Sequence, residues 1–183
     1  MNRGYFQKFQ IKDVVFLAIM SAVALATCAV MPLVISLQPL IFGISQLVTA
    51  LQIGVFFAIG LYKVRKPGSL LIMALMMGLI QLMMSPPMFL SSVLNGILIE
   101  LIVLLLFRGY ERDTAVFVAA MLHTPLSLPF NYLYNRLVKG ADSPLAAVAD
   151  RAPLATVGMT LAVVAVSALG ALIGIKIARE LKK

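Results

Sequence analysis

The chain has 183 residues, of which 62% are hydrophobic and only 12% are charged. Soluble domains usually have about 45–50% apolar and about 25% charged residues, so this composition excludes an ordinary water-soluble fold and favours a membrane protein. A single cysteine excludes an internal disulfide scaffold. The net charge of +8 would suit nucleic-acid binding, but the distribution of the basic residues indicates membrane topology instead.

Six apolar segments follow one another along the chain. A helix needs roughly 20 apolar residues to cross a hydrocarbon core about 30 Å thick, and each segment meets or approaches that length. They cover residues 14–35, 40–62, 69–85, 88–107, 114–134 and 154–175. The first is too long for a signal-peptide core and lacks a clear cleavage site, so we expect it to be retained. The sequence predicts one all-α membrane domain over residues 1–183, with six transmembrane helices.

The basic residues divide unequally between the two sides of such a six-helix domain. If the helices alternate in direction, twelve of the 15 Lys and Arg residues fall on one side. They are Arg3, Lys8, Lys12, Lys63, Arg65, Lys66, Arg108, Arg112, Lys176, Arg179, Lys182 and Lys183, whereas Arg136, Lys139 and Arg151 fall on the other. The positive-inside rule then predicts that both termini of this multi-pass protein are cytoplasmic. The long outer connection, residues 139–153, is either a lid or a solvated loop.

Sequence motifs of common enzymes are absent. No G-x-x-x-x-G-K-[ST], H-E-x-x-H or G-x-S-x-G motif occurs. One His and one Cys do not make a protein-only zinc site, and we expect neither a metal nor a cofactor. We therefore expect a protein that binds or passes a ligand. A membrane enzyme using Glu100 and His123 as acid and base is an alternative.

Glu100 is the one carboxylate inside the predicted spans. It lies about 18 Å from the outer end of its helix, as judged from the helical rise. An ionised carboxylate at that depth needs a cationic or multiply donating partner. Either Glu100 binds an amino or amidine-like group of a ligand, or it is protonated or hydrogen-bonded to a neighbouring helix for stability.

Neutral polar residues concentrate in the outer halves of the second to fifth spans. Ser92 and Asn95 are three residues apart and Asn131 and Asn135 are four apart, so each pair shares a helix face. The predicted ligand-binding set is Glu100, Asn95, Ser92, Gln81, Gln46, Asn131, Tyr132, Asn135 and His123. Such groups can instead join helices by hydrogen bonds, but the whole cluster favours a pocket. For His123, the alternatives are donation to the helix carbonyl that Pro125 frees and ligation of a metal or haem.

Small residues form a stripe on the first predicted helix. Ala18, Ala22 and Ala26 follow the pattern A-x-x-x-A-x-x-x-A, which leaves a groove for the close approach of another helix. Gly170, Gly174 and Ala178 repeat this spacing in the last helix. With its length, six spans and lack of an ATPase motif, the chain resembles the substrate-binding S components of energy-coupling factor (ECF) vitamin transporters.

The resemblance implies a multi-pass binding subunit of the bacterial cell membrane that works with partners. The alanine stripe would dock on a transmembrane coupling subunit, which acts with two ABC ATPases, while the chain captures its ligand from outside. The stretch at 65–83 and the G-x-x-x-E from Gly96 to Glu100 are closest to YkoE-type S components, which are associated with thiamin or hydroxymethylpyrimidine. This chain departs from that group in having Ala74 or Gln81 where acidic residues are expected in the third helix, and it has no tryptophan. Alternatives are another ligand such as haem, or a self-contained small transporter or channel.

Overall fold

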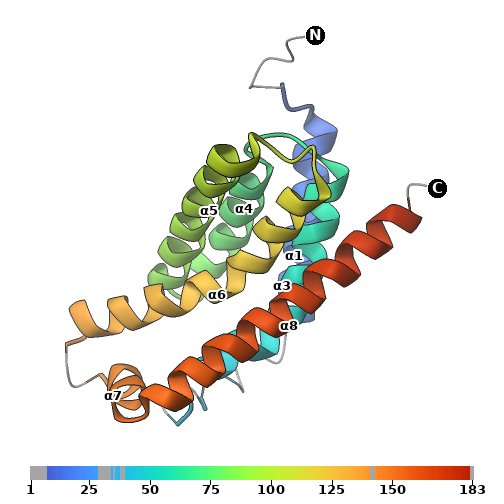
Figure 1. Cartoon of the computed structure of the whole chain (residues 1–183). Coiled ribbons are helices and arrows are strands. Elements are labelled where there is room, and N and C mark those ends of the chain that lie inside the picture. Colours follow the sequence, from blue (N-terminus) through green and yellow to red (C-terminus); the bar gives the residue numbers. More distant parts are fainter. Residues whose placement is uncertain (1–7, 29–33, 35, 38–39, 141–142, 182–183) are drawn as a thin grey trace.

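The fold is known from a computed structural model, which describes residues 8–28, 34, 36–37, 40–140 and 143–181. Its regular elements over these residues are helices, arranged as an elongated bundle (Figure 1). They are α1 (Ile11–Thr27), α3 (Ile44–Lys63), α4 (Ser69–Leu82), α5 (Pro86–Phe107), α6 (Asp113–Leu137), α7 (Pro144–Arg151) and α8 (Pro153–Glu180).

Four of the described helices are long and apolar enough to cross a membrane: α3, α5, α6 and α8. Helix α4 is apolar but has only 14 residues, because Ser85 adopts an extended conformation and Pro86 starts the next helix. Proline is favoured at the first position of a helix, where no backbone donor is needed. Helix α1 has 17 residues, and part of the predicted segment 14–35 lies outside the described residues. The all-helical, multi-span architecture is confirmed, whereas the number six stays a prediction.

Helix α3 lies at the centre of the bundle and packs against α1, α4, α6 and α8. Its contact with α8 is the closest, because glycines remove side-chain bulk where the two backbones meet. A Cβ atom added to Gly170 would lie 2.5 Å from the carbonyl oxygen of Leu51, and one added to Gly174 would clash with the carbonyl of Val55. The small-residue stripe of the last helix is therefore used inside the chain.

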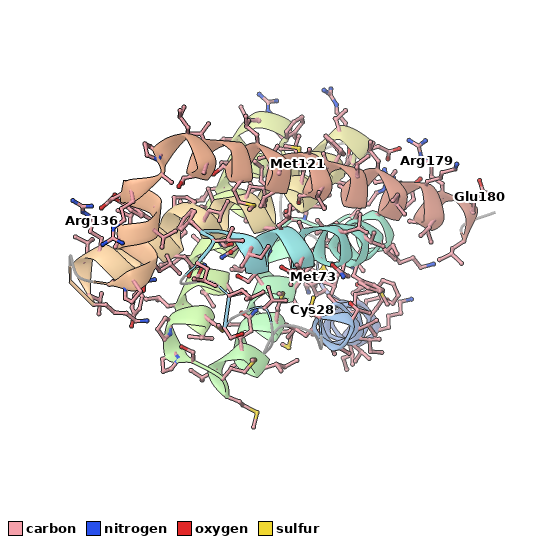
Figure 2. The ribbon with its side chains drawn as sticks, turned by 90° about the horizontal axis from the view of Figure 1, so that it is seen from below. Cys28, Met73, Met121, Arg136, Arg179 and Glu180 are labelled. Atoms are coloured by element: carbon pink, nitrogen blue, oxygen red, sulfur yellow. The ribbon has the colours of Figure 1, made fainter. Side chains whose placement is uncertain are left out.

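Ion pairs show which helix ends lie together. Lys66 contacts Asp13 at 2.6 Å, while Asp113 contacts Arg65 at 2.5 Å and Arg179 at 2.6 Å. These contacts place the start of α1, the α3–α4 connection, the start of α6 and the end of α8 at one end, called here the basic end. Arg136 lies at the opposite end, where it pairs with Asp150 (Figure 2). The described helices therefore alternate in direction as the charge distribution requires, whereas which end faces the cytoplasm stays a prediction.

The connection between α6 and α8, predicted to lie outside the membrane, contains a helix. Residues 144–151 form α7, whereas the sequence predicted either a lid or a solvated loop here. Helix α6 extends to Leu137 and contains Pro125 and Pro129. Figure 1 shows that α6 changes direction along its length, as expected for a helix with internal prolines.

Candidate ligand-binding cavity

A cavity of about 120 Å³ lies among α3, α4, α5 and α6, toward the end of the bundle opposite the basic end. Six of the nine predicted ligand-binding residues line it: Gln46, Gln81, Ser92, Asn95, His123 and Asn131. The other lining residues are Ser45, Thr49, Ile53, Met77, Met88, Ser91, Thr124 and Ser127. The structure thus brings together most of the polar cluster from four separate helices.

Helical periodicity explains why these side chains meet. In α6, His123, Ser127 and Asn131 recur every four residues and therefore share one face, and Thr124 lies beside them. In helix α5, Met88, Ser92 and Asn95 are spaced by four and then three residues and also share one face. The opposite face of α5 carries exposed Leu90, Ile97 and Leu101, among others. These helices are apolar outward and polar inward, which suits lipid outside and a polar site inside.

Four polar atoms in this cavity have no hydrogen-bond partner among the described residues. They are Oδ1 of Asn95, Oγ1 of Thr124, and both ring nitrogens of His123. All three residues are nearly inaccessible, with exposed fractions of 1%, 3% and 4% respectively. Leaving a buried polar group unpaired costs about 1–3 kcal/mol, so such a concentration makes this cavity a candidate binding site.

The lack of hydrogen-bond partners for the His123 ring nitrogens has a specific cause. Pro125 has no N–H, so the carbonyl of Met121, four residues earlier, loses its helical donor. Ser167 of α8 donates to that oxygen at 2.7 Å. The interpretation in which His123 donates to this carbonyl is therefore wrong, because α8 already supplies the donor. The His123 ring instead packs on Phe57, with 4.4 Å between the ring centroids.

Other hydroxyls of the cavity are already paired with helix carbonyls. Thr49 donates to Ser45 at 2.9 Å, Ser92 to Ala74 at 3.0 Å and Ser127 to Thr124 at 2.7 Å. Of these, the bond from Ser92 joins α5 to α4, in agreement with the alternative that polar side chains join helices by hydrogen bonds. The groups with most capacity for a ligand are therefore those of Asn95, His123 and Thr124.

Glu100 does not line the cavity. Its carboxylate accepts hydrogen bonds from the backbone N–H of Gly68 at 2.6 Å and from the hydroxyl of Tyr110 at 2.9 Å. Gly68 is the N-cap of α4, where unpaired N–H groups and the positive end of the helix dipole favour an anion. Burial and the nearby carboxylate raise the pKa of Tyr110 well above its usual value, so its hydroxyl stays a donor.

This geometry gives Glu100 the partners that its second interpretation expects, hydrogen bonds to a neighbouring helix, and places it outside the cavity lining. Glu100 lies seven residues before the end of α5, nearer the basic end. The structure does not bring Glu100 and His123, the alternative acid–base pair, together in one cavity, because only His123 lines it.

Tyr132 and Asn135 also lie outside the cavity lining. Tyr132 donates to Asp150 at 2.8 Å and accepts from Arg136 at 2.9 Å. Asn135 accepts from Ser143 at 3.0 Å. Both side chains fasten the segment containing α7 to the end of α6, a role that the sequence did not indicate because α7 was not predicted.

Sequence reasoning omitted several cavity residues from the predicted set. Ser45, Thr124 and Ser127 line the cavity, and the spacing of His123, Ser127 and Asn131 would have found Ser127. Within the described part of the chain, no three His, Cys, Asp or Glu side chains come together as metal ligands.

The alanine stripe of α1 faces away from the bundle. Ala22 and Ala26 are exposed and Ala18 is half-buried, whereas Leu17 and Ser21 are fully buried. Ser21 donates to the carbonyl of Met73 at 3.1 Å and so holds the inner face of α1 against α4. The stripe is therefore accessible over the residues that the structure describes.

Comparison with known proteins identifies a family but gives no activity. The family described as "Hypothetical bacterial integral membrane protein (Trep_Strep)" matches residues 11–183. No curated protein and no solved structure matches the chain. The family match covers nearly the whole sequence and agrees with four described helices that can each cross a membrane. The chain is thus a multi-pass integral membrane protein and belongs to the Trep_Strep family.

Proposed function

We propose that this protein is the membrane-embedded S component of an ECF-type ABC importer in the bacterial cell membrane. It captures a small vitamin or vitamin precursor from outside and delivers it through a coupling subunit and two ABC ATPases. The chain itself is not an enzyme, since ATP hydrolysis belongs to the partners. The observation that carries the proposal is the polar cavity with four unpartnered buried atoms inside an apolar helical bundle.

The position of the cavity supports capture from outside. It lies away from the basic end, which the positive-inside rule assigns to the cytoplasm. Polar groups in a membrane domain are costly unless they serve a ligand, a pathway or helix packing. Helix packing already accounts for Ser92 and Ser167, but it leaves Asn95, His123 and Thr124 without partners.

The exposed alanines of α1 support docking on a partner. Small residues allow two helix backbones to approach closely, which is a main source of helix association in lipid. Ala22→Leu should therefore weaken assembly with the coupling subunit at least tenfold while ligand affinity is unchanged. Ala165→Leu, the same change at an exposed position of α8, is the matched control and should leave assembly intact.

Reconstitution distinguishes the proposal from a self-contained transporter. The purified chain in liposomes should bind the small molecule that copurifies with it but should not accumulate it without the coupling subunit and ATPases. Uptake by the chain alone would contradict the proposal and favour an independent transporter or channel. Equal loss of assembly in Ala22→Leu and Ala165→Leu would show that the alanine stripe is not the docking face.

A further inference from the structure

We infer, on the basis of the proposed function, that the ligand is an uncharged single-ring heterocycle carrying both hydrogen-bond donors and acceptors. Charge is the first argument. Among the described residues, every lining side chain of the cavity is neutral, from Gln46 and Gln81 to Asn95 and His123. A buried ion without an opposite charge costs several kcal/mol, so neither a cation nor an anion suits this lining.

Glu100 offers no countercharge to a cation. Its two oxygens accept from Gly68 and Tyr110, and it does not line the cavity. The basic side chains Arg65, Lys66 and Arg179 form ion pairs at the basic end, and Arg136 forms its ion pair with Asp150 at the opposite end. None of the four lines the cavity, so they offer no countercharge to an anion there.

Size is the second argument. The cavity has a volume of about 120 Å³, whereas an engineered protein cavity of about 150 Å³ holds one benzene molecule. A ligand on the scale of one six-membered ring is therefore what the cavity volume supports. Ile53, Met77 and Met88 offer apolar contacts to the faces of such a ring, since methionine adapts its shape to a neighbour. A porphyrin is far too large, so haem does not fit this cavity.

Hydrogen-bonding capacity is the third argument. The Oδ1 atom of Asn95 accepts, a neutral imidazole has one donor and one acceptor nitrogen, and the hydroxyl of Thr124 does both. A ligand that satisfies all three must offer donors and acceptors close together. An amide-like N–H beside a C=O, or an amino group beside a ring nitrogen, meets this requirement within one ring. Thiamin has a cationic second ring, whereas hydroxymethylpyrimidine is neutral and has one ring, so the cavity favours the second class.

The test uses the full chain purified in mild detergent. Retained small molecules are identified by mass spectrometry, and binding is measured for a charge-matched set: nicotinamide, cationic 1-methylnicotinamide and anionic nicotinate. Hydroxymethylpyrimidine and thiamin form a second pair. We expect every retained molecule to be neutral with one ring, and each neutral probe to bind at least tenfold more tightly than its charged counterparts.

A charge-introducing variant makes the test independent of the natural ligand. Gln81→Glu places a carboxylate of the same shape at the half-buried edge of the cavity, and should shift the preference toward 1-methylnicotinamide at least tenfold. Gln10→Glu makes the same change at the basic end and should leave the preference unchanged. Unaltered preference in Gln81→Glu would contradict the placement of the site.

The outcomes separate this inference from the proposed function. Retention of a charged or multi-ring molecule overturns the neutral single-ring ligand but leaves a substrate-binding subunit standing. If the chain retains no molecule and binds no probe, the proposed function fails and the inference fails with it.

Discussion

Glu100 is the acidic residue whose role the structure changes most, and Glu100→Gln tests the new role. The carboxylate accepts a hydrogen bond at each oxygen, from Gly68 and from Tyr110. An amide of the same shape keeps only one acceptor oxygen, and its NH₂ group then faces the second donor. Hydrogen bonds to charged groups contribute about 1.5–3 kcal/mol each, and a charge at a helix N-terminus adds about 0.3–1 kcal/mol. Glu100→Gln should therefore lower the free energy of unfolding by about 2–4 kcal/mol.

The assay compares stability with ligand affinity in the same variants. Unfolding is followed in mild detergent, and affinity is measured for the copurifying ligand at a temperature where each variant remains folded. Tyr110→Phe is the matched control, because it removes one donor and keeps the carboxylate; its loss should be smaller, about 1.5 kcal/mol. Affinity should be unchanged in both. A loss of affinity in Glu100→Gln without a loss of stability would refute the structural role and return Glu100 to the ligand site.

Three further predictions concern the cavity, the α3–α8 contact and the basic end. His123→Phe should raise the free energy of unfolding of the ligand-free chain by about 1–3 kcal/mol, because it removes unpaired buried nitrogens. The same variant should abolish ligand binding. A lower free energy of unfolding would show that the ring is already paired. Gly174→Val should lower the free energy of unfolding by about 1–3 kcal/mol, because the added side chain overpacks against α3. Its control is Gly158→Ala, whose added Cβ atom meets open space and should leave thermal unfolding unchanged. The hydrogen bond from Lys66, followed by that from the Gln10 backbone, lowers the pKa of Asp13, which precedes the first predicted span. The stabilisation by this pair is therefore present above the ordinary pKa of 3.8 and lost as pH falls through the folded-state value. Lys66→Met should reduce this acid dependence in an unfolding titration, and an unaltered profile would contradict the assignment.

The cavity was largely predictable because two strong physical constraints act on it. Polar side chains are costly in lipid, and helical spacing decides which of them share a face. Gln46, Ser92, Asn95, His123 and Asn131 satisfied both conditions in the sequence, and the structure brings them to one place. Glu100 satisfied only the first condition. Its partner Gly68 lies 32 residues away along the chain, and nothing in the spacing showed that the start of α4 would meet α5 there.

Competition for partners explains both the error about His123 and the chemistry of the cavity. A proline in a helix frees one carbonyl, and a nearby imidazole is a plausible donor to it. In this fold the donor comes from Ser167, because the glycines of α8 bring that helix close enough to the centre of the bundle. The imidazole is then left with both nitrogens unpaired beside Asn95 and Thr124. Tight α3–α8 packing therefore affects the cavity at a distance, because Ser167 satisfies the proline-freed carbonyl and the His123 ring stays directed to the cavity, where the proposed ligand would bind.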